Sequence, residues 1–486
     1  MFIELVLVTA IISVIVYRFL SKTTNKAYDT FYNTPSPIRF PVLGSSYLLF
    51  GRNILLALTY NIEKYGQSFL AYIPHRTYVT AIPEEVKIIL NHPNALNKSK
   101  EYNHLRWIFA KSLLLTHADP WRVNRKLISR SFKQGILDSF VTTFYKKSCL
   151  LNDILRRDAY KNIYYLLEEF TLDVFSEATL GIESSILKDE KEHRFVVGVT
   201  TIQTLLMSRI GNIIKMNDFI FSFLPDGIRA KKCRTDMNNY IQDIIEKKRS
   251  IGIKQDIYSP SARLPVLDLL LEIAEKENLT DNYISEEMFL FAGAATDTTA
   301  YTIAYACCLL GMHPEIQEKI YKEIIETIGK EEEILYSDLS KLKYTEMALN
   351  ETQRILPSIP IIGRHTTADI SLGDKVIPKN TGIIISIFNI HRNPEYYPDP
   401  LVFNPDRFLP EEVAKRPQNT FLPFSQGPRN CIGMKYASML MKTAIVNIVR
   451  NFKISSKYKS VSELKLVSNV VMSTTHPLDL TFTPRS

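Results

Sequence analysis

The longest regular pattern of apolar residues inside the chain runs over residues 284–311 and has the spacing of an α-helix. Apolar residues lie on nearly every side of that helix, which predicts that it is buried through the middle of the fold. The pattern stops near Pro314, because proline cannot continue a helix. Polar residues at 296–299 favour a bent core helix whose hydroxyls bond to its own backbone.

Helical spacing also dominates residues 83–355, whereas β-branched and aromatic residues predict a strand pair at 72–82. Short strand-like runs return over residues 364–387, and another strand pair is expected near 466–481. The sequence contains no internal repeat and no clear second domain. These patterns predict a mainly α protein with small β-sheets near its two ends, an α+β fold in one globular body over residues 45–486.

The N-terminal segment, residues 1–20, is almost entirely apolar and long enough to span a bilayer as a helix. Positive charge follows at Arg18, Lys22 and Lys26, which orients the rest of the chain towards the cytosol. A cleaved signal peptide is the alternative, and it fits less well because the positive charges follow the apolar run. We therefore expect a transmembrane anchor at 1–20 and a basic, proline-rich connector at 21–44.

Composition narrows the function classes. The chain has 486 residues, 23% of them charged, and a formal net charge of +8. This mild basic excess suits an acidic protein partner or an anionic membrane surface, and equally an ordinary solvated surface. No Lys/Arg run is dense enough to indicate nucleic-acid binding. The five cysteines are odd in number and form no CxxC pair, which favours a reducing compartment and argues against a structural zinc site.

The strongest chemical signal is the segment 424–433, which contains Cys431. Gly427 and Pro428 predict a turn before the cysteine, and peptide N–H groups at a helix start stabilise a thiolate. One cysteine with glycines around it suits a single axial bond to iron rather than a tetrahedral metal site. Arg429 offers donors to an anionic cofactor group. The alternative, an inert buried cysteine, fits this spacing poorly.

The segment resembles the haem-binding loop of the cytochrome P-450 family, in which Phe, Gly, Arg, Cys and Gly recur at these spacings. The matching residues are Phe424, Gly427, Arg429, Cys431 and Gly433. The resemblance implies the P-450 fold, with haem b as cofactor and Cys431 as the axial ligand of its iron. It also implies a microsomal haem-thiolate monooxygenase, which inserts one oxygen atom from O2 into a lipophilic substrate.

Two further motifs resemble parts of the family that hold the cofactor and the region behind it. Trp121, Arg125 and Arg364 resemble ligands of the haem propionates, since an indole N–H and planar guanidinium groups can donate to carboxylates. A surface arginine is the plain alternative for each guanidinium. Glu351 and Arg354 lie three residues apart, on one helix face, and can pair. With Arg407 they resemble the family's buried structural Glu/Arg/Arg cluster.

Residues 294–299 resemble the oxygen-activating segment of the family's central helix. Asp297 and Thr298 match its acid and threonine, which implies that they deliver protons. Ala295 stands where the family usually has glycine, and its methyl group would crowd the groove where oxygen binds. Ala294 stands where many members of one branch carry a glutamate that esterifies the haem, so we expect non-covalent haem. That branch is the animal fatty-acid ω-hydroxylases, including insect members, which residues 97–102, 112–116 and 125–132 resemble.

Electrons must come from another protein, because the sequence has no Gly-rich dinucleotide fingerprint and no length for a flavin domain. The resemblance implies NADPH–cytochrome P-450 reductase as the donor and allows cytochrome b5 as a second partner. It also implies the endoplasmic reticulum membrane, with the catalytic domain in the cytosol and in contact with membrane lipid. The basic residues we expect to face the reductase are Arg122, Lys126, Lys133 and Lys435.

Two other functions stay open at this point. A haem-thiolate isomerase or dehydratase would act on lipid peroxides without O2, and such relatives tend to lose the acid–threonine pair. Asp297 and Thr298 argue against it, whereas Ala295 leaves it open. A non-catalytic haem binder is the other alternative, and the complete set of relay and propionate residues weighs against it. The sequence does not distinguish a fatty acid, a hormone-like lipid and a xenobiotic as the substrate.

Overall fold

The computed structural model describes residues 34–40, 44–49, 53–73, 75–109, 112–132, 134–157, 162–188, 194–209, 212–251, 265–277 and 279–485. The predicted anchor at 1–20 and most of the predicted connector at 21–44 lie outside these ranges. Within them, no helix combines the length and the hydrophobicity needed to cross a membrane. The described end of the connector lies along the body, where the Pro35 carbonyl accepts a hydrogen bond from Leu70 N at 2.9 Å.

Helices make up most of the described chain, as the sequence predicted. Their bounds are α2 (Ile54–Tyr65), α3 (Pro83–Asn91), α4 (Arg106–Phe109), α5 (Ala118–Ile128), α6 (Gln134–Arg157), α7 (Ile163–Ala178), α8 (Arg194–Met207), α9 (Ile213–Met216), α10 (Asp218–Phe223), α11 (Pro225–Ile251), α12 (Val266–Glu277), α13 (Asp281–Met312), α14 (Pro314–Thr327), α15 (Tyr336–Leu339), α16 (Lys343–Ile355), α17 (Ile387–His391), α18 (Pro410–Ala414) and α19 (Met434–Asn451). A short 3-10 helix, η7 (Pro405–Phe408), lies between α17 and α18.

Within the described residues, four small sheets accompany the helices. The largest has the strand order β1 (Ser68–Tyr72), β2 (Arg76–Thr80), β6 (Gly382–Ser386) and β3 (Ile361–His365). Strands β2 and β6 are parallel, and the other neighbours in this sheet are antiparallel. The two-stranded sheets pair β4 (Ile370–Ser371) with β5 (Val376–Ile377), β7 (Phe452–Ser456) with β10 (Leu480–Pro484), and β8 (Leu466–Ser468) with β9 (Met472–Thr474).

The strand predictions are right in kind and shifted in position. The pair expected at 72–82 is β1 and β2, but β1 begins at Ser68, so the turn rather than a strand follows Tyr72. The pair expected near 466–481 is the β8–β9 hairpin, whereas β10 pairs with β7. Sequence analysis missed β7 because this strand begins at Phe452, directly after α19, with no turn residue between them.

The buried helix predicted at 284–311 is α13, one turn longer at its start. The Thr280 side chain caps it by accepting a hydrogen bond from Tyr283 N at 3.2 Å, and Pro314 begins α14 instead of extending α13. Helical structure continues without a break through 294–299. Two of the hydroxyls there bond to the helix itself, as predicted, since Thr296 Oγ1 donates to Ala292 O at 2.6 Å and Thr298 Oγ1 donates to Ala294 O at 2.8 Å. The Thr299 hydroxyl is buried without a partner within the described chain.

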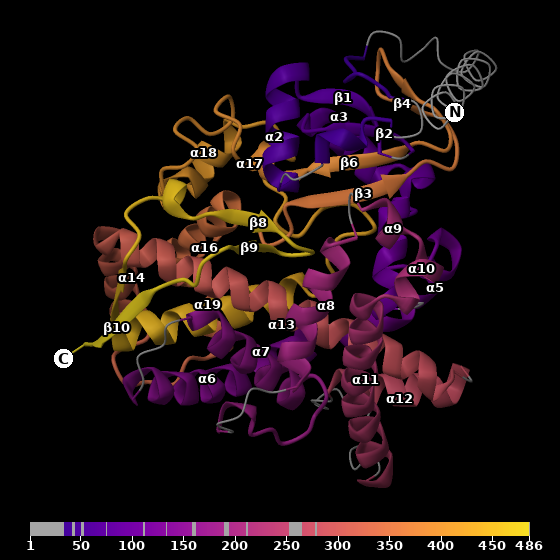
Figure 1. Cartoon of the computed structure of the whole chain (residues 1–486). Helices are drawn as coiled ribbons and strands as arrows, with labels where there is room; N and C mark the ends of the chain where they lie inside the picture. The colour runs from indigo at the N-terminus through magenta and orange to yellow at the C-terminus, as the bar shows by residue number, and fades with distance from the viewer. Residues whose placement is uncertain are drawn as a thin grey trace, which may run out of the picture.

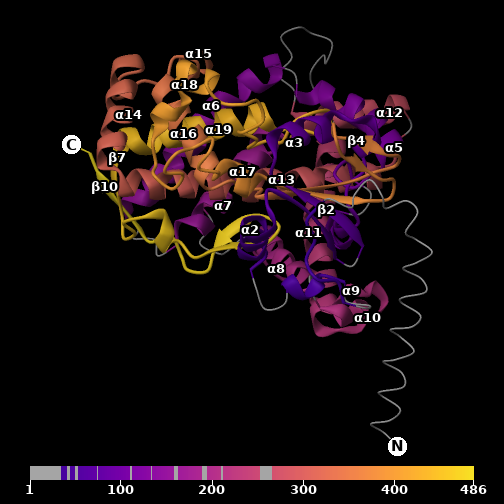
Figure 2. The same ribbon diagram turned by 90° about the horizontal axis from the view of Figure 1, so that it is seen from above.

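Helix α13 runs through the centre of the molecule. Its residues are almost all buried, and it packs against α7, α11, α16 and α19. Figure 1 shows α13 crossing the helical body. The four-stranded sheet, α2 and α3 lie above it in this view. In Figure 2, turned by 90°, α9 and α10 lie at the margin of the molecule near α11. The described chain is therefore one mainly helical body with small sheets, as predicted.

Candidate active site

The loop before α19 presents Cys431 in a fixed backbone conformation. Cys431 N donates to Phe424 O at 3.0 Å, and Asn430 N donates to Gly427 O at 3.1 Å. Gly427 has a φ of +74°, and a Cβ placed on it would lie 2.2 Å from Leu90 O. Glycine is therefore required at this turn, both for its backbone angle and for the close approach of the neighbouring chain.

Cys431 is an exposed residue, although much protein surrounds its thiol. Burial raises the pKa of the Cys431 thiol, while the Gly433 N–H and the charge of Arg125 act in the opposite direction. A Cβ on Gly433 would lie 3.9 Å from the sulfur, so this glycine leaves the space beside it open. The loop thus offers one accessible thiol whose anion is stabilised by a peptide N–H and a guanidinium group.

Helix α5 carries Trp121 and Arg125, one turn apart, and both contact this loop. The Arg125 guanidinium donates to Asn430 twice, to its backbone O at 3.1 Å and to its Oδ1 at 2.9 Å. The buried Trp121 ring lies 4.4 Å below the guanidinium of Arg429, a cation–π contact. Arg429 itself donates to Leu113 O at 3.3 Å and to Thr116 O at 2.5 Å.

Cationic side chains gather beside the Cys431 loop without a matching carboxylate in their described surroundings. Arg364 and Arg429 are buried, and each retains an N–H group without a partner within the described chain, at Nη2 and Nε. Burial, together with the charges of Arg364 and Arg125, lowers the pKa of Arg429 to about 9. Burial and the charges of Arg364 and Arg429 lower the pKa of Lys98 well below its usual value. A cationic cluster of this kind needs anions to compensate its charge, and the two propionate carboxylates of a haem fit it.

Sequence analysis missed Lys98 as a member of this cluster. The residue lies in the segment 97–102, which resembles one branch of the family, and nothing near it in the sequence marks a cofactor. Its ammonium lies 5.0 Å from the Tyr102 ring centroid, and burial also raises the pKa of the Tyr102 hydroxyl. Lys98 comes to the cluster through packing, because the next residue, Ser99, is buried and packs against Gly363 next to Arg364.

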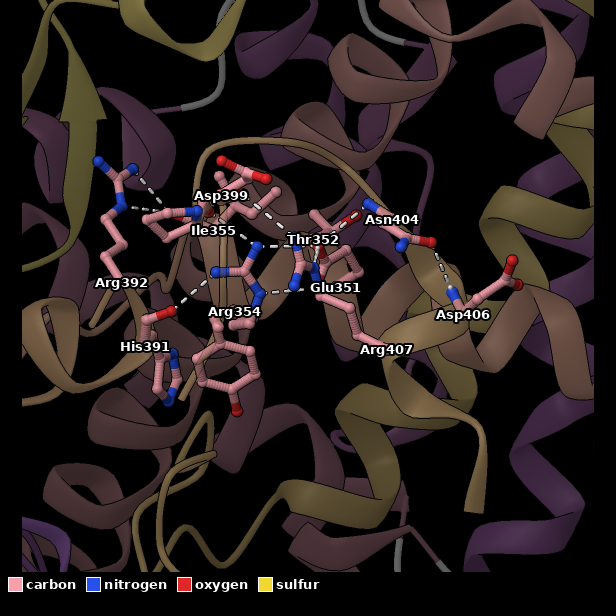
Figure 3. Close-up of polar contacts among 12 residues, drawn as sticks. Glu351, Thr352, Arg354, Ile355, His391, Arg392, Asp399, Asn404, Asp406 and Arg407 are labelled. Atoms are coloured by element: carbon pink, nitrogen blue, oxygen red, sulfur yellow. Dashed lines mark hydrogen bonds and ion pairs between the residues drawn. The ribbon is translucent and has the colours of Figure 1, made fainter. Parts of the chain in front are cut away.

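The structure also brings together Glu351, Arg354 and Arg407 (Figure 3). Glu351 and Arg354 are fully buried, and Arg354 Nε donates to Glu351 Oε2 at 2.6 Å. Arg407, on η7, lies with its Nε 3.4 Å from Glu351 Oε1, and its Nη2 donates to Pro398 O at 2.6 Å. The Glu351 carboxylate therefore joins α16 to η7, which lie about fifty residues apart in the sequence. The result is an ion-paired cluster whose side chains also bond to backbone groups.

This cluster reaches the cysteine loop through His391. Arg354 Nη1 donates to His391 O at 2.7 Å, and His391 Nε2 accepts from Leu422 N at 2.7 Å. Burial and the charge of Arg354 lower the pKa of His391 to about 3, so its ring is neutral and can accept that hydrogen bond. Because Leu422 O accepts from Ser425 N at 3.1 Å, the chain of contacts continues into the turn that presents Cys431.

Helix α13 has two distinct faces at residues 287–300. All of these residues are buried except Ala294, Ala295 and Thr298, which therefore line accessible space on one face. Thr298 Oγ1 donates to Ala294 O at 2.8 Å. Thr298 O accepts from Ser358 Oγ at 3.0 Å, which ties the segment after α16 to this part of the helix. The sequence did not predict this contact, because Ser358 lies 60 positions from Thr298.

Asp297 points away from that face. Its side chain is buried and accepts hydrogen bonds from Tyr164 Oη at 2.6 Å and Gln203 Nε2 at 2.5 Å. Burial raises the pKa of Asp297 to about 6, and the two hydrogen bonds limit the rise. Asp297 and Thr298 are adjacent in sequence, but the structure sets their side chains on different sides of α13.

Comparison with known proteins decides the family. The cytochrome P450 family model matches residues 34–482. The chain belongs to the cytochrome P450 family. It is 30% identical to cytochrome P450 4c21 of Blattella germanica over 84% of this chain and 85% of the relative. It is 31% identical to cytochrome P450 4c3 of Drosophila melanogaster, over 83% and 79% of the two chains.

Membership in this family makes the chain a haem-thiolate monooxygenase with haem iron as its cofactor. The isomerase or dehydratase and the non-catalytic haem binder, which the sequence left open, gain no support from these relatives. The predicted branch is confirmed, because the relatives are insect P450s, among them cytochrome P450 4g1 and probable cytochrome P450 313a2 of Drosophila melanogaster. The residue roles within this P450 rest on the geometry described above.

Proposed function

We propose that this P450 holds haem b between the Cys431 loop and the accessible face of α13, with Cys431 as the axial ligand. The observation that carries the proposal is the buried cationic cluster beside that loop, whose unpartnered N–H groups suit the two propionates. The ligands of the propionates would be Trp121, Arg125, Arg364 and Arg429, joined by Lys98. When bound, haem supplies the oxidising chemistry, since a thiolate donates electron density that favours O–O cleavage.

Thr298 and Asp297 would move the protons that oxygen activation consumes. Thr298 carries its hydroxyl on the accessible face of α13, where Oγ1 can pass a proton on while accepting another. Asp297 holds its carboxyl on the opposite, buried side, with a pKa of about 6 that makes proton exchange near neutral pH efficient. Water or a rotation of the Asp297 side chain would join the two groups around the helix.

Aromatic residues pack against the stretch of α13 that precedes Thr298, which supports a lipophilic substrate. The Phe109 ring lies 6.1 Å from that of Phe289 and would contact a Cβ placed on Gly293 at 3.4 Å. Phe132 packs on Phe291 at 5.8 Å. Apolar walls of this kind favour a fatty acid or a molecule of similar size. Ala294 offers no carboxylate for an ester bond, so the haem is held non-covalently.

NADPH–cytochrome P450 reductase would dock on the cysteine side of the protein, with cytochrome b5 as an optional second donor. Arg122, Lys126 and Lys435 are exposed there, on α5 and at the start of α19. Lys133, the fourth candidate, lies outside the described residues. The apolar segment 1–20 would anchor the protein in the endoplasmic reticulum membrane, with the catalytic domain in the cytosol.

Reconstitution with the reductase tests this function. With NADPH, the purified enzyme should incorporate one atom of isotopically labelled O2 into a fatty acid or a similar lipophilic compound. Binding of that compound should also displace water from the iron and shift the Soret band. A preparation that binds small polar compounds alone, or that converts lipid peroxides equally well without NADPH, would contradict the proposal.

A further inference from the structure

A second carboxyl group lies buried next to Asp297, on the side of α13 that faces away from Thr298. Glu168, on α7, is fully buried, and its Oε1 has no hydrogen-bond partner within the described chain. Its Oε2 accepts from Thr200 Oγ1, on α8, at 3.5 Å. Helix α7 is held against α13 at this point, because Thr171 Oγ1 donates to Thr296 O at 3.0 Å.

Tyr164 joins the two carboxyl groups. Its hydroxyl donates to Asp297 Oδ1 at 2.6 Å, and Tyr164 also acts on Glu168, one turn along the same helix, by lowering the pKa of that carboxyl. The Tyr164 ring stacks on Tyr301 of α13 with 3.9 Å between ring centroids, which fixes the position of the hydroxyl. The three groups therefore form a continuous polar path across the interface between α7 and α13.

No positive charge is found among the described residues that influence the pKa of either carboxyl. The described groups that act on either carboxyl are Tyr164 and Glu169 of α7, Thr200 and Gln203 of α8, and the other carboxyl itself; Tyr301 of α13 also faces both. None of these is a cation. Two carboxylates cannot both be charged in such an interior without a large cost, so one proton is retained between them.

We propose that Glu168 and Asp297 share one proton and that Glu168 recharges Asp297 after each proton has been passed towards Thr298. This inference rests on the proposed role of Asp297 and Thr298 in proton delivery. Burial and the charge of Asp297 raise the pKa of Glu168, in agreement with a group that stays protonated near neutral pH. Glu168 acts through Asp297, because it holds the proton that Asp297 receives, and is therefore a positioning residue.

The transfer balances without any further reactant. The Tyr164 O–H bond breaks as its proton passes to Asp297 Oδ1, and a new Tyr164 O–H bond forms with the proton that leaves Glu168. The pair carries one negative charge before and after this step. A proton that Asp297 then gives up is replaced from water near Thr200 and Gln203, which are both partly exposed on α8.

Infrared spectroscopy of the holoenzyme tests the shared proton independently of turnover. The parent enzyme should show C=O bands of protonated carboxylic acids at neutral pH, one of them from Glu287, whose pKa is raised to about 8. Glu168→Gln should remove a band that remains in Glu287→Gln. Glu169→Gln changes the neighbouring, partly exposed carboxyl of the same helix and should leave the band in place. A band that persists unchanged in Glu168→Gln, or that is lost in Glu169→Gln, would overturn the proposal.

Coupling measurements test the recharging. At about pH 8, Glu168→Gln should lower product formed per NADPH on the order of tenfold, with less effect at about pH 6, where water supplies protons more readily. Tyr164→Phe keeps the stacked ring and should show the same pH-dependent defect, whereas Glu168→Asp should restore part of the coupling. Substrate binding and haem content should not change.

The outcomes separate this inference from the proposed function. If the parent couples NADPH to product and Glu168→Gln does so equally well at both pH values, Glu168 has no part in recharging. A uniform loss at both pH values, with no rescue by Glu168→Asp, would indicate a structural role and would also overturn the proposal. If the parent itself forms no product with reductase and NADPH, the proposed function fails first, while the infrared result still decides whether the pair shares a proton.

Discussion

The hydroxyl of Thr298 and the carboxyl of Asp297 occupy different environments, although the two residues are neighbours. Thr298 lies at an accessible stretch of an otherwise buried helix, and Asp297 is enclosed between α13, α7 and α8. Sequence alone identified both residues, because the acid–threonine pattern is local. It did not identify Tyr164, Gln203 or Glu168, because these lie about 95 to 135 positions away and are brought to Asp297 by helix packing.

Replacing Thr298 with alanine should uncouple NADPH consumption from product formation. The change removes the hydroxyl that relays protons, so we expect roughly a tenfold loss of product per NADPH and more released hydrogen peroxide, with haem content nearly intact. Thr299→Ala removes a buried hydroxyl from the adjacent position and serves as the control. Product, NADPH and peroxide measured in the same assay decide the matter, and equal coupling in Thr298→Ala would mean that protons arrive by another route.

At the scale of elements, the Glu351 carboxylate fixes α16, α17 and η7 relative to one another behind the cysteine loop. The Glu351–Arg354 contact could be predicted, because the two residues are three apart on one helix. The involvement of Arg407 came from family resemblance. The backbone partners of Arg354, His391 O and Pro400 O, could not be read from the sequence, since they depend on how irregular segments fold over α16.

The variant Glu351→Gln should destabilise the protein strongly. It leaves the buried Arg354 and the partly buried Arg407 without their carboxylate, and breaking a buried ion pair in this way typically costs about 3–5 kcal/mol. Glu412→Gln disrupts an exposed pair with Lys415, 2.6 Å long, and should cost no more than about 1 kcal/mol. Free energies of unfolding from denaturant titration, with haem content measured alongside, compare the two. Similar losses for both variants would contradict the structural role of the cluster.

Glu287 makes the attachment of α13 to the segment 112–116 dependent on pH. The side chain is fully buried and accepts a hydrogen bond from Leu113 N at 3.0 Å, while burial raises its pKa to about 8. A raised pKa means that the folded state retains a proton that the unfolded state has lost. Stability is therefore fully present below the unfolded pKa and falls as pH rises towards about 8, at up to about 1.4 kcal/mol per pH unit.

The comparison of Glu287→Gln with the parent at about pH 5 and about pH 8 tests this directly. The variant cannot ionise, so its melting temperature relative to the parent should rise as the pH rises. Glu277→Gln, at an exposed position of α12, should show no such trend. A pH-independent difference between Glu287→Gln and the parent would mean that Glu287 is not protonated in the folded protein.

For the whole molecule, the sequence was sufficient for the fold class and for the single globular body, because the family's motifs extend over most of the chain. It was insufficient for long-range pairing. The β7–β10 sheet joins strands that are separated by the β8–β9 hairpin. The resemblance had already assigned Arg125, Arg364 and Arg429 to the cofactor, but it missed Lys98, which joins them from a separate segment. Positions of this kind are fixed by packing around α13 rather than by any local pattern.

Electron delivery to the whole enzyme should weaken with added salt, because it depends on basic residues around the cysteine side. Reversal of charge in Lys126→Glu or Lys435→Glu should lower the rate of reduction by the reductase several-fold at low ionic strength. Lys330→Glu alters net charge equally at an exposed position after α14, outside α5 and α19, and is the control. Stopped-flow reduction rates that change neither with added salt nor in Lys126→Glu and Lys435→Glu would count against this docking face.

The central claim is that Cys431 is the thiolate ligand of the haem iron, and the absorbance spectrum of the reduced carbon monoxide complex tests it most directly. The parent and Cys233→Ser, which changes a partly buried cysteine of α11, should both show the thiolate-type band at about 450 nm. Cys431→Ser should lack that band, because serine replaces the soft sulfur donor. Retention of the band in Cys431→Ser, or its absence from the haem-loaded parent, would contradict the account.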